Sequence, residues 1–341
     1  MNNCIKAGGM ALLAFLCSCA HLPDVTVGYY LAQSQPRFKV IRTVACDANN
    51  MPIVVTSVTP AVLHWADQAQ FIPLRLSGLK GAFSDTDVKF DFYDDGRLKN
   101  VNATGTGQGE VIFKTAVTIA STAAALAFDG GAKGYPEECE IIKGAGGGKP
   151  LTLTYEGAVD VTKIGSASQD IPADPTSGIY ASKLATVIGR VCAQVGTVEP
   201  ANAPAAYQAE SGGVILKARQ PALLNITVTA GAIGGCRSDT IWEGRLPVAQ
   251  LGVPYSLPIP VAKVFGKQVF AVCFAESGAL TSLQYASNGG VGQTLNVASS
   301  ALTALSGETT AQKAADVKAQ ADLILQQQRL IQCQADPKSC K

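Results

Sequence analysis

The acidic residues that could bind a metal ion are concentrated in one short stretch of the chain. Five aspartates occur within eleven positions: Asp85, Asp87, Asp91, Asp94 and Asp95. Carboxylate oxygens are the ligands that Ca²⁺ prefers, so the best candidate for a metal site is the cluster Asp91, Asp94 and Asp95. The spacing of these residues differs from that of an EF-hand loop, however. We therefore expect a solvated turn here and no metal site.

Histidine chemistry would depend on His64, because the other histidine of the chain, His21, lies close to its N-terminus. A serine hydrolase triad needs a histidine beside its nucleophile. The patterns Gly-x-Ser-x-Gly, His-Glu-x-x-His and Cys-x-x-Cys do not occur in the sequence. We therefore expect His64 to be a surface or packing residue, and we predict no catalytic residue. Because two carboxylates suffice for glycoside hydrolysis, a carboxylate-dependent envelope hydrolase stays an alternative.

A glycine-rich segment, Gly105-Thr-Gly107-Gln-Gly109, follows an expected strand, as phosphate-binding turns do. It lacks the third glycine of the dinucleotide-binding pattern. In addition, Glu110 would place a negative charge where a phosphate needs positive potential. We therefore predict no nucleotide or other cofactor.

The first twenty residues predict export from the cell. Lys6 precedes an apolar run, residues 7–17, which is too short to cross a bilayer and is typical of a signal peptide. The run ends in Leu16-Cys17-Ser18-Cys19, which resembles the lipobox of bacterial lipoproteins. This resemblance implies cleavage between Ser18 and Cys19, and a membrane anchor of acyl chains such as palmitate on Cys19. Alanine rather than aspartate at position 20 implies the outer membrane, with the protein facing the periplasm or the cell surface.

Cysteine usage also fits an oxidising compartment. Seven cysteines follow Cys19: Cys46, Cys139, Cys192, Cys236, Cys273, Cys333 and Cys340. Because seven is odd, at least one thiol is free, buried or intermolecular. Cys333 and Cys340 flank a segment with Asp336-Pro337, which can turn the chain back, so we predict a disulfide between them. The sequence leaves the other pairings open.

Composition and net charge limit the kinds of partner that we expect for the protein. The chain has 341 residues, of which 47% are hydrophobic, and this is enough for the cores of two domains. Its formal net charge of +1 provides no basic surface for nucleic acid. We expect membrane contact through the lipid, a protein partner in the envelope, and no nucleic-acid partner.

Three segments recur in the same order, 182 to 185 residues further along the chain. Residues 28–36 match 213–221, residues 71–74 match 256–259, and residues 88–98 match 270–280. In the third match, alternating apolar residues precede an acidic-x-Gly turn in both copies, which favours a β-hairpin. We therefore predict an internal duplication.

Each copy is expected to continue from its hairpin into a helix. The first such helix, residues 110–128, has an uncharged core too short to span a membrane, and its counterpart, 293–305, is more polar. Residues 306–333 lack proline, have no glycine after Gly307, and predict one long helix. This helix would pack along the repeats, or form a coiled coil with a partner or with another copy of the chain.

The predicted fold class is therefore α+β, with two tandem duplicated strand-hairpin-helix modules, antiparallel sheets and a long C-terminal helix. The expected parts are a signal peptide (1–18), a lipidated tether (19–27), a first module (28–130), a linker or insertion with a strand at 151–161 (131–212), a second module (213–305), and the C-terminal helix with its cysteine loop (306–341).

These features favour an envelope-anchored lipoprotein that acts as a non-enzymatic binding or assembly module. A second alternative, besides the hydrolase, is a lipoprotein that binds a small molecule or sugar. That alternative predicts a deep apolar pocket between the two repeats. The low aromatic content, 6%, argues mildly against a sugar-binding surface.

Overall fold

The computed structural model describes most of the chain between Val25 and Ser287. The described residues are 25–79, 87–104, 122–127, 134–165, 168–201, 214–231, 236, 239–259, 268–287 and Arg329, with the main chain alone at 87, 104, 122–127, 268 and 286–287. Within these residues the protein is mostly β. Twelve strands form three antiparallel sheets, and the three α-helices found there are short.

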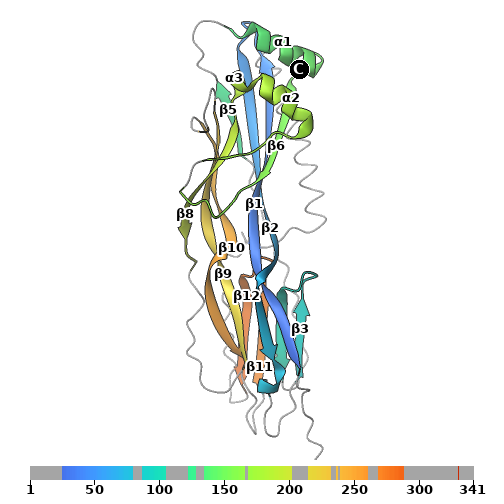
Figure 1. Ribbon diagram of the computed structural model, residues 1–341, viewed down its shortest axis with the longest axis vertical. Coiled ribbons are helices and arrows are strands. Elements are labelled where there is room, and N and C mark those ends of the chain that lie inside the picture. The colour runs from blue at the N-terminus through green and yellow to red at the C-terminus, as the bar shows by residue number, and fades with distance from the viewer. Residues whose placement is uncertain are drawn as a thin grey trace, which may run out of the picture.

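Two long β-hairpins run along the molecule (Figure 1). β1 (Thr26–Cys46) pairs with β2 (Pro52–Arg75), and β9 (Val214–Ala230) pairs with β10 (Asp239–Ile259). A strand advances about 3.3 Å per residue, so the 21 residues of β1 span roughly 70 Å. The protein is therefore an elongated rod, in which β1 begins at one end and the tip of the first hairpin lies at the other.

The upper half of the rod, as drawn in Figure 1, is a sandwich of two four-stranded sheets, in the orders β5-β2-β1-β6 and β10-β9-β8-β7. The added strands are β5 (Thr122–Ala127), β6 (Leu151–Ala158), β7 (Gln169–Asp170) and β8 (Val191–Glu199). Apolar side chains between the sheets form one cluster, the upper core. Within it, the rings of Phe38 and Trp242, from opposite sheets, are 5.1 Å apart.

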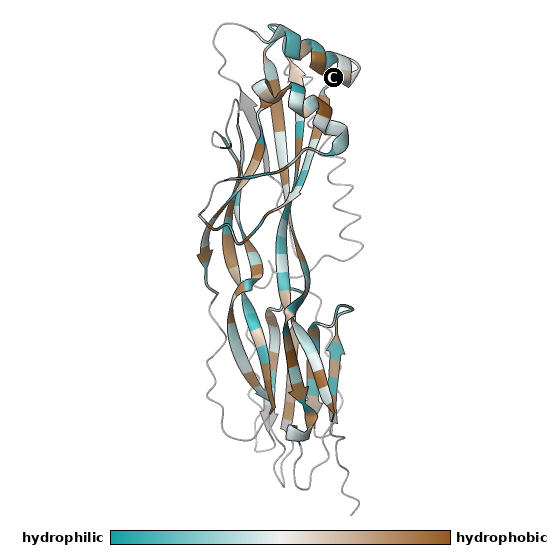
Figure 2. Cartoon of the chain, in the orientation of Figure 1, coloured by the Kyte–Doolittle hydropathy of each residue, from teal (hydrophilic) through white to brown (hydrophobic). Residues whose placement is uncertain are grey.

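The lower half contains the third sheet, in the order β12-β11-β4-β3. Its strands are β3 (Asp87–Phe92), β4 (Leu98–Thr104), β11 (Gln268–Phe274) and β12 (Leu280–Ser287). The short hairpins β3-β4 and β11-β12 meet through β4 and β11, and they pack against the long hairpins to form a lower core. A 3₁₀ turn, η1 (Leu76–Leu79), follows β2. Figure 2 shows apolar and polar residues alternating along the strands, as expected when one face is buried.

Three helices cover the upper end of the rod (Figure 1): α1 (Pro136–Gly146), α2 (Pro175–Lys183) and α3 (Ala185–Ile188). Asp174 caps the N-terminus of α2, and its carboxylate accepts a hydrogen bond of 2.7 Å from the N–H of Ser177. Buried residues of α1 and α3, including Ile142 and Val187, belong to the upper core. The helices therefore close this end of the sandwich.

The predicted α+β fold class is wrong, because the described chain is mostly β and contains no long helix. The expected helix at 110–128 is contradicted at residues 122–127, which form β5 and pair with residues 53–58 of β2. Alanine favours a helix by only tenths of a kcal/mol per residue, and hydrogen bonding to a neighbouring strand outweighs such a preference. The expected helices at 293–305 and 306–333 lie outside the described residues, apart from Arg329.

Both short hairpins expected from the repeat are present. Each has an acidic-x-Gly turn, and the turn glycines have positive φ values, 86° at Gly96 and 80° at Gly278. Glycine adopts such a conformation without the strain that a Cβ atom causes. Residues 131–212, expected to be a linker or insertion, supply α1 to α3 and β6 to β8, and β6 lies beside β1 at the position of the expected strand.

Two disulfides connect the tips of the long hairpins to this inserted segment. Cys46, at the end of β1, is bonded to Cys139 in α1. Cys236, in the connection between β9 and β10, is bonded to Cys192 in β8. Both bonds therefore fasten the half of the rod that carries the helices. The remaining described cysteine, Cys273, is a free thiol of intermediate exposure.

A single free thiol is expected in the processed chain. The predicted Cys333–Cys340 bond lies outside the described residues, and if it forms, Cys273 is the odd cysteine. Denatured, unreduced protein should then react with one equivalent of a thiol reagent, and Cys273→Ser should abolish the reaction. Reaction of three equivalents would show that Cys333 and Cys340 are not bonded.

Candidate functional site

The two cores meet at a junction near the middle of the rod, where both long hairpins have the same irregularity. In the first hairpin, residue 30 of β1 pairs with residue 71 of β2 and residue 32 pairs with residue 66. One residue of β1 therefore lies opposite four residues of β2. In the second, residue 220 of β9 pairs with residue 253 of β10 and residue 222 pairs with residue 248. One residue of β9 again lies opposite four residues of the second strand. Each second strand therefore contains three extra residues there, and we call these segments the first and second bulge.

The second bulge binds Ser34 of β1 through three hydrogen bonds. The side chain of Gln250 accepts from the N–H of Ser34 at 2.9 Å and donates to its carbonyl at 2.8 Å. The N–H of Ala249 donates to the Ser34 hydroxyl at 3.1 Å. Because β6 pairs with β1 only from Arg37 onward, Gln250 satisfies main-chain groups that would otherwise lack a strand partner.

Ser34 also forms a serine–histidine pair, since its Oγ lies 2.9 Å from Nδ1 of His64. The hydroxyl accepts from Ala249, so its proton can be donated to Nδ1, which implies a neutral imidazole protonated on Nε2. Burial, together with the positive charge of Arg97, lowers the pKa of His64 to about 4. Ser34 is 1% exposed, and a substrate therefore has no access to its hydroxyl. This arrangement fastens the hairpins together and does not provide a nucleophile.

Stability is expected to fall as the pH decreases from about 6.5 towards 4 because of His64. Unfolded histidine binds a proton near pH 6.5, whereas the folded chain does so only near pH 4, so acid favours the unfolded state in this window. Above this window His64 is neutral in both states, and below it His64 is charged in both.

Urea denaturation at pH 7 and pH 5 measures this effect. Between pH 7 and pH 5 the free energy of unfolding of the wild type should fall by on the order of 1 kcal/mol more than that of His64→Gln. The amide oxygen of glutamine can also accept the hydrogen bond from Ser34. Equal losses in the two proteins would contradict the role of His64. The only other histidine, His21, lies near the N-terminus, which makes the comparison specific.

The first bulge makes the matching contact with the second hairpin. Asp67 lies 3.6 Å from Nη1 of Arg219 on β9, and the two side chains are 15% and 14% exposed. Each bulge therefore contacts the first strand of the other hairpin. The two hairpins therefore hold each other reciprocally at the junction.

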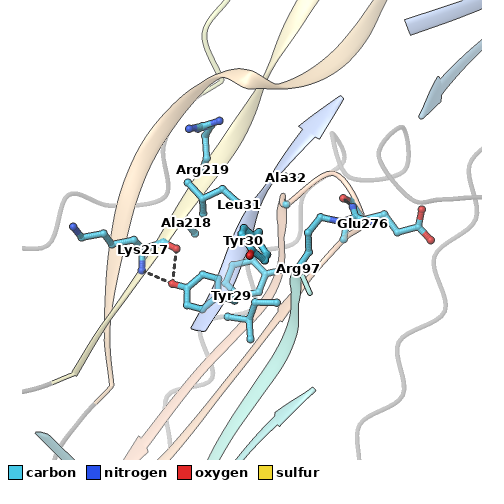
Figure 3. Close-up of a pocket in the computed structure, with 13 residues that line it drawn as sticks. Tyr29, Tyr30, Leu31, Ala32, Arg97, Lys217, Ala218, Arg219 and Glu276 are labelled. Carbon is cyan, nitrogen blue, oxygen red and sulfur yellow. Dashed lines mark hydrogen bonds between the residues drawn. The ribbon is translucent and has the colours of Figure 1, made fainter. Parts of the chain in front are cut away.

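A small pocket opens at the junction, where the long and short hairpins meet (Figure 3). Its walls come from both predicted repeats, with residues 29–32 and 97–98 from the first and residues 217–219 and 274–278 from the second. The hydroxyl of Tyr29 donates to the carbonyl of Lys217 at 2.8 Å and accepts from its N–H at 2.9 Å. Tyr29 therefore joins β1 to β9 at the wall of the pocket.

The pocket is too small for a sugar or drug-sized ligand. Its volume is about 20 Å³, whereas ligand sites usually measure several hundred Å³. A space of this size accommodates water. Glu276 is the acidic residue of its lining, so the two-carboxylate arrangement of a glycoside hydrolase is missing there.

Arg97 connects the turns of the two short hairpins. It is buried, its Nε donates to the carboxylate of Asp95 at 2.7 Å, and its Nη1 donates to the carbonyl of Glu276. Its guanidinium carbon lies 4.9 Å from the centre of the Tyr93 ring, and the Tyr93 hydroxyl donates to the carbonyl of Phe274. Burial, reinforced by the charge of Glu276, raises the pKa of Tyr93 to about 12. These contacts are structural.

The three aspartates named as a weak metal candidate have separate environments. Asp91 pairs with Lys89 at 3.4 Å, Asp95 pairs with Arg97, and Asp94 is exposed in the turn between β3 and β4. Two of the three carboxylates, those of Asp91 and Asp95, are therefore already paired with positively charged side chains.

A different group of possible ligands lies close together. One carboxylate oxygen of Asp170 and the sulfurs of Cys192 and Cys236 are within 4.8 Å of one another. The two sulfurs form a disulfide, so they are not available as thiolate ligands. Asp170 itself pairs with Arg190 at 2.6 Å.

Several predicted site residues fall outside the described part of the chain. They are Ser18 and Cys19 of the cleavage and lipidation site, and Cys333 and Cys340 of the proposed disulfide. None of the described helices is long and apolar enough to cross a membrane.

The residues that build the junction were missed by sequence reasoning. Ser34, Asp67, Arg219 and Gln250 each depend on a partner in the other hairpin, and their spacing along the chain gives no sign of it. The one available signal was a polar residue at an inward position of an alternating strand, as at Ser34.

In comparisons with known proteins, no family model, curated protein or solved structure matches the chain. What the protein does is therefore inferred from the geometry of the rod and from the motif at Cys19.

Proposed function

We propose that this protein is a lipid-anchored rod of the bacterial cell envelope, which binds a protein partner and catalyses no reaction. The anchor is Cys19, and the membrane is the outer membrane, with the rod facing the periplasm or the cell surface. The surface that meets the partner is the upper end of the rod, around α1 and α2.

The observation that carries this proposal is the position of β1. This strand begins at Thr26, seven residues after Cys19, at the end of the rod opposite the helices (Figure 1). Seven extended residues reach about 25 Å at most. A lipid on Cys19 would therefore keep the lower core near the membrane and hold the helices roughly 70 Å beyond it.

The construction of the rod suits a spacer or assembly module. β1 and β2 pass through both cores without a break in the strand, and the two bulges connect the hairpins reciprocally at the junction. The disulfides Cys46–Cys139 and Cys192–Cys236 fasten the far end. A rigid rod holds its end at a fixed distance, which is useful for binding a partner away from the membrane.

Neither alternative function gains support from the described residues. The pocket between the repeats is far smaller than a ligand site for a sugar or small molecule. Its lining also has no pair of carboxylates for glycoside hydrolysis.

Site-specific photo-crosslinking in cells tests the proposed geometry. The probe replaces Ile179, which is 62% exposed on α2, and in a matched control it replaces Val25, which is 44% exposed at the lower end. We expect one protein partner to crosslink from position 179 and not from position 25. The same partner from both positions, or none from any position near α1 and α2, would overturn the proposal.

The anchor is tested separately by metabolic labelling with a fatty acid that carries a clickable group. The wild type should be labelled and Cys19→Ala should not. Label that persists in Cys19→Ala would show that the anchor is assigned to the wrong residue. Cys19→Ala should also lose the crosslink from position 179, because the rod no longer stands on the membrane.

A further inference from the structure

A positive charge is buried in the upper core with no carboxylate beside it. Arg42 on β1 is 0% exposed. Its side chain lies on the inner face of the first sheet, as do those of Val40 and Val44 two positions away on either side, which belong to the upper core. Among the described residues, no aspartate or glutamate forms an ion pair with it within 4.0 Å. An uncompensated charge in such a place is strongly unfavourable.

The contacts of Arg42 compensate its charge only in part. Its Nη1 donates to the carbonyl of Ile188, and more weakly to that of Gly189 at 3.5 Å, at the end of α3. Its Nε is buried and has no hydrogen-bond partner. Burial lowers the pKa of Arg42, and the contact with Tyr155 and a smaller Coulombic attraction to Asp239 only partly oppose this shift. The guanidinium nevertheless stays protonated, as arginine does in proteins.

Two buried hydroxyl groups lie next to Arg42. Thr56 of β2 is directly opposite Arg42 in the first sheet and is 1% exposed. Tyr155 of β6 is its diagonal neighbour, opposite Val40, and is 4% exposed. The Tyr155 hydroxyl faces the Arg42 guanidinium, and this contact partly opposes the effect of burial on the pKa of both groups. Neither hydroxyl has a hydrogen-bond partner of ordinary geometry. Three neighbouring strands thus bring three buried polar side chains with incomplete hydrogen bonding to one place on the same face of the sheet.

We propose that Arg42, Thr56 and Tyr155 form a binding site for a small monovalent anion, such as chloride, inside the upper core. Buried polar groups of native proteins are nearly always bonded, to protein, water or an ion. Water would satisfy the two hydroxyls and Nε but would leave the charge of Arg42 uncompensated. An anion accepts hydrogen bonds from all three groups and also neutralises the charge of Arg42. This inference is independent of the proposed envelope function.

Thermal unfolding of the full chain in detergent tests the site. Midpoints are compared in sodium chloride and in sodium gluconate of equal ionic strength, because gluconate is too large to enter the core. We expect chloride to raise the midpoint of the wild type. A tenfold increase in chloride above its dissociation constant should raise the folding equilibrium constant about tenfold.

Conservative variants show whether the effect belongs to this site. Tyr155→Phe and Thr56→Val keep the shape of the core and should weaken the chloride effect, whereas Arg42→Met should abolish it. Arg245→Met is the matched control, because Arg245 is an exposed arginine paired with Glu199, and it should respond like the wild type. If Arg42→Met does not fold, the other two variants still decide the question.

Two results would overturn the proposal. Equal midpoints of the wild type in chloride and gluconate would mean that the site contains water alone. A chloride effect of undiminished size in both Tyr155→Phe and Thr56→Val would place the binding elsewhere on the protein. A bromide ion found beside Nε of Arg42 in crystals grown with bromide would support the proposal directly.

Discussion

Replacing Cys46 and Cys139 by serine is expected to lower the free energy of unfolding by about 4 to 5 kcal/mol. The two cysteines are 93 residues apart, and a bond that closes so long a loop removes much of the conformational entropy of the unfolded chain. The second bond closes a loop of 44 residues, and its removal should cost about 4 kcal/mol. Both losses are large compared with the stability of an ordinary domain.

Urea denaturation measures these losses, with Cys273→Ser as the control. Cys273 is a free thiol of intermediate exposure, so its replacement should change the free energy of unfolding by less than about 1 kcal/mol. Hydrogen exchange should increase in α1 of the Cys46→Ser/Cys139→Ser variant and change little in β11. A double variant as stable as Cys273→Ser would mean that the bond does not constrain the chain.

Alanine at position 252 is expected to destabilise the protein by about 3 kcal/mol. Gly252 lies in the second bulge, where an added Cβ atom would be 2.1 Å from the carbonyl oxygen of Gln220 and 2.9 Å from that of Ala249. Both oxygens belong to the main chain and cannot rotate away. The bulge would have to shift, and its bonds to Ser34 would weaken with it.

The matched control for this prediction is Gly178→Ala. Gly178 lies within α2, and a Cβ atom added there has no other atom within 4 Å. Because alanine favours a helix by about 1 kcal/mol over glycine, this variant should be as stable as the wild type or slightly more stable. Chemical denaturation of both variants and of the wild type measures these differences in the free energy of unfolding. Equal stability of Gly252→Ala and the wild type would show that the bulge is not closely packed.

The short hairpins illustrate which parts of the fold can be read from the sequence. Alternating apolar residues and the turn glycines Gly96 and Gly278 are local features, and a hairpin is a local structure. The long hairpins gave a weaker signal, because residues such as Ile41 and Thr43 are buried on the outer face and interrupt the alternation. A strand that is buried on both faces shows no clear period.

Residues 122–127 show where local preference fails. Their alanine-rich sequence is typical of a helix, but the open edge of β2 provides hydrogen bonds that make them a strand. The pairing of Cys46 with Cys139 stayed open in the sequence for a related reason, since the two come together only after the inserted segment folds over the hairpin tip. Contacts between distant segments depend on the whole topology, and residue spacing does not contain them.

The sequence by itself determined the features that depend on neighbouring residues: the lipobox-like motif that ends in Cys19, the repeated pattern, the two short hairpins and the odd number of cysteines. The tertiary structure decided the features that depend on distant partners. These are the sheets, the disulfides, the reciprocal bulges at the junction and the isolated charge of Arg42. The physical reason is that burial and hydrogen bonding are properties of an environment, and the fold creates that environment by bringing remote strands side by side.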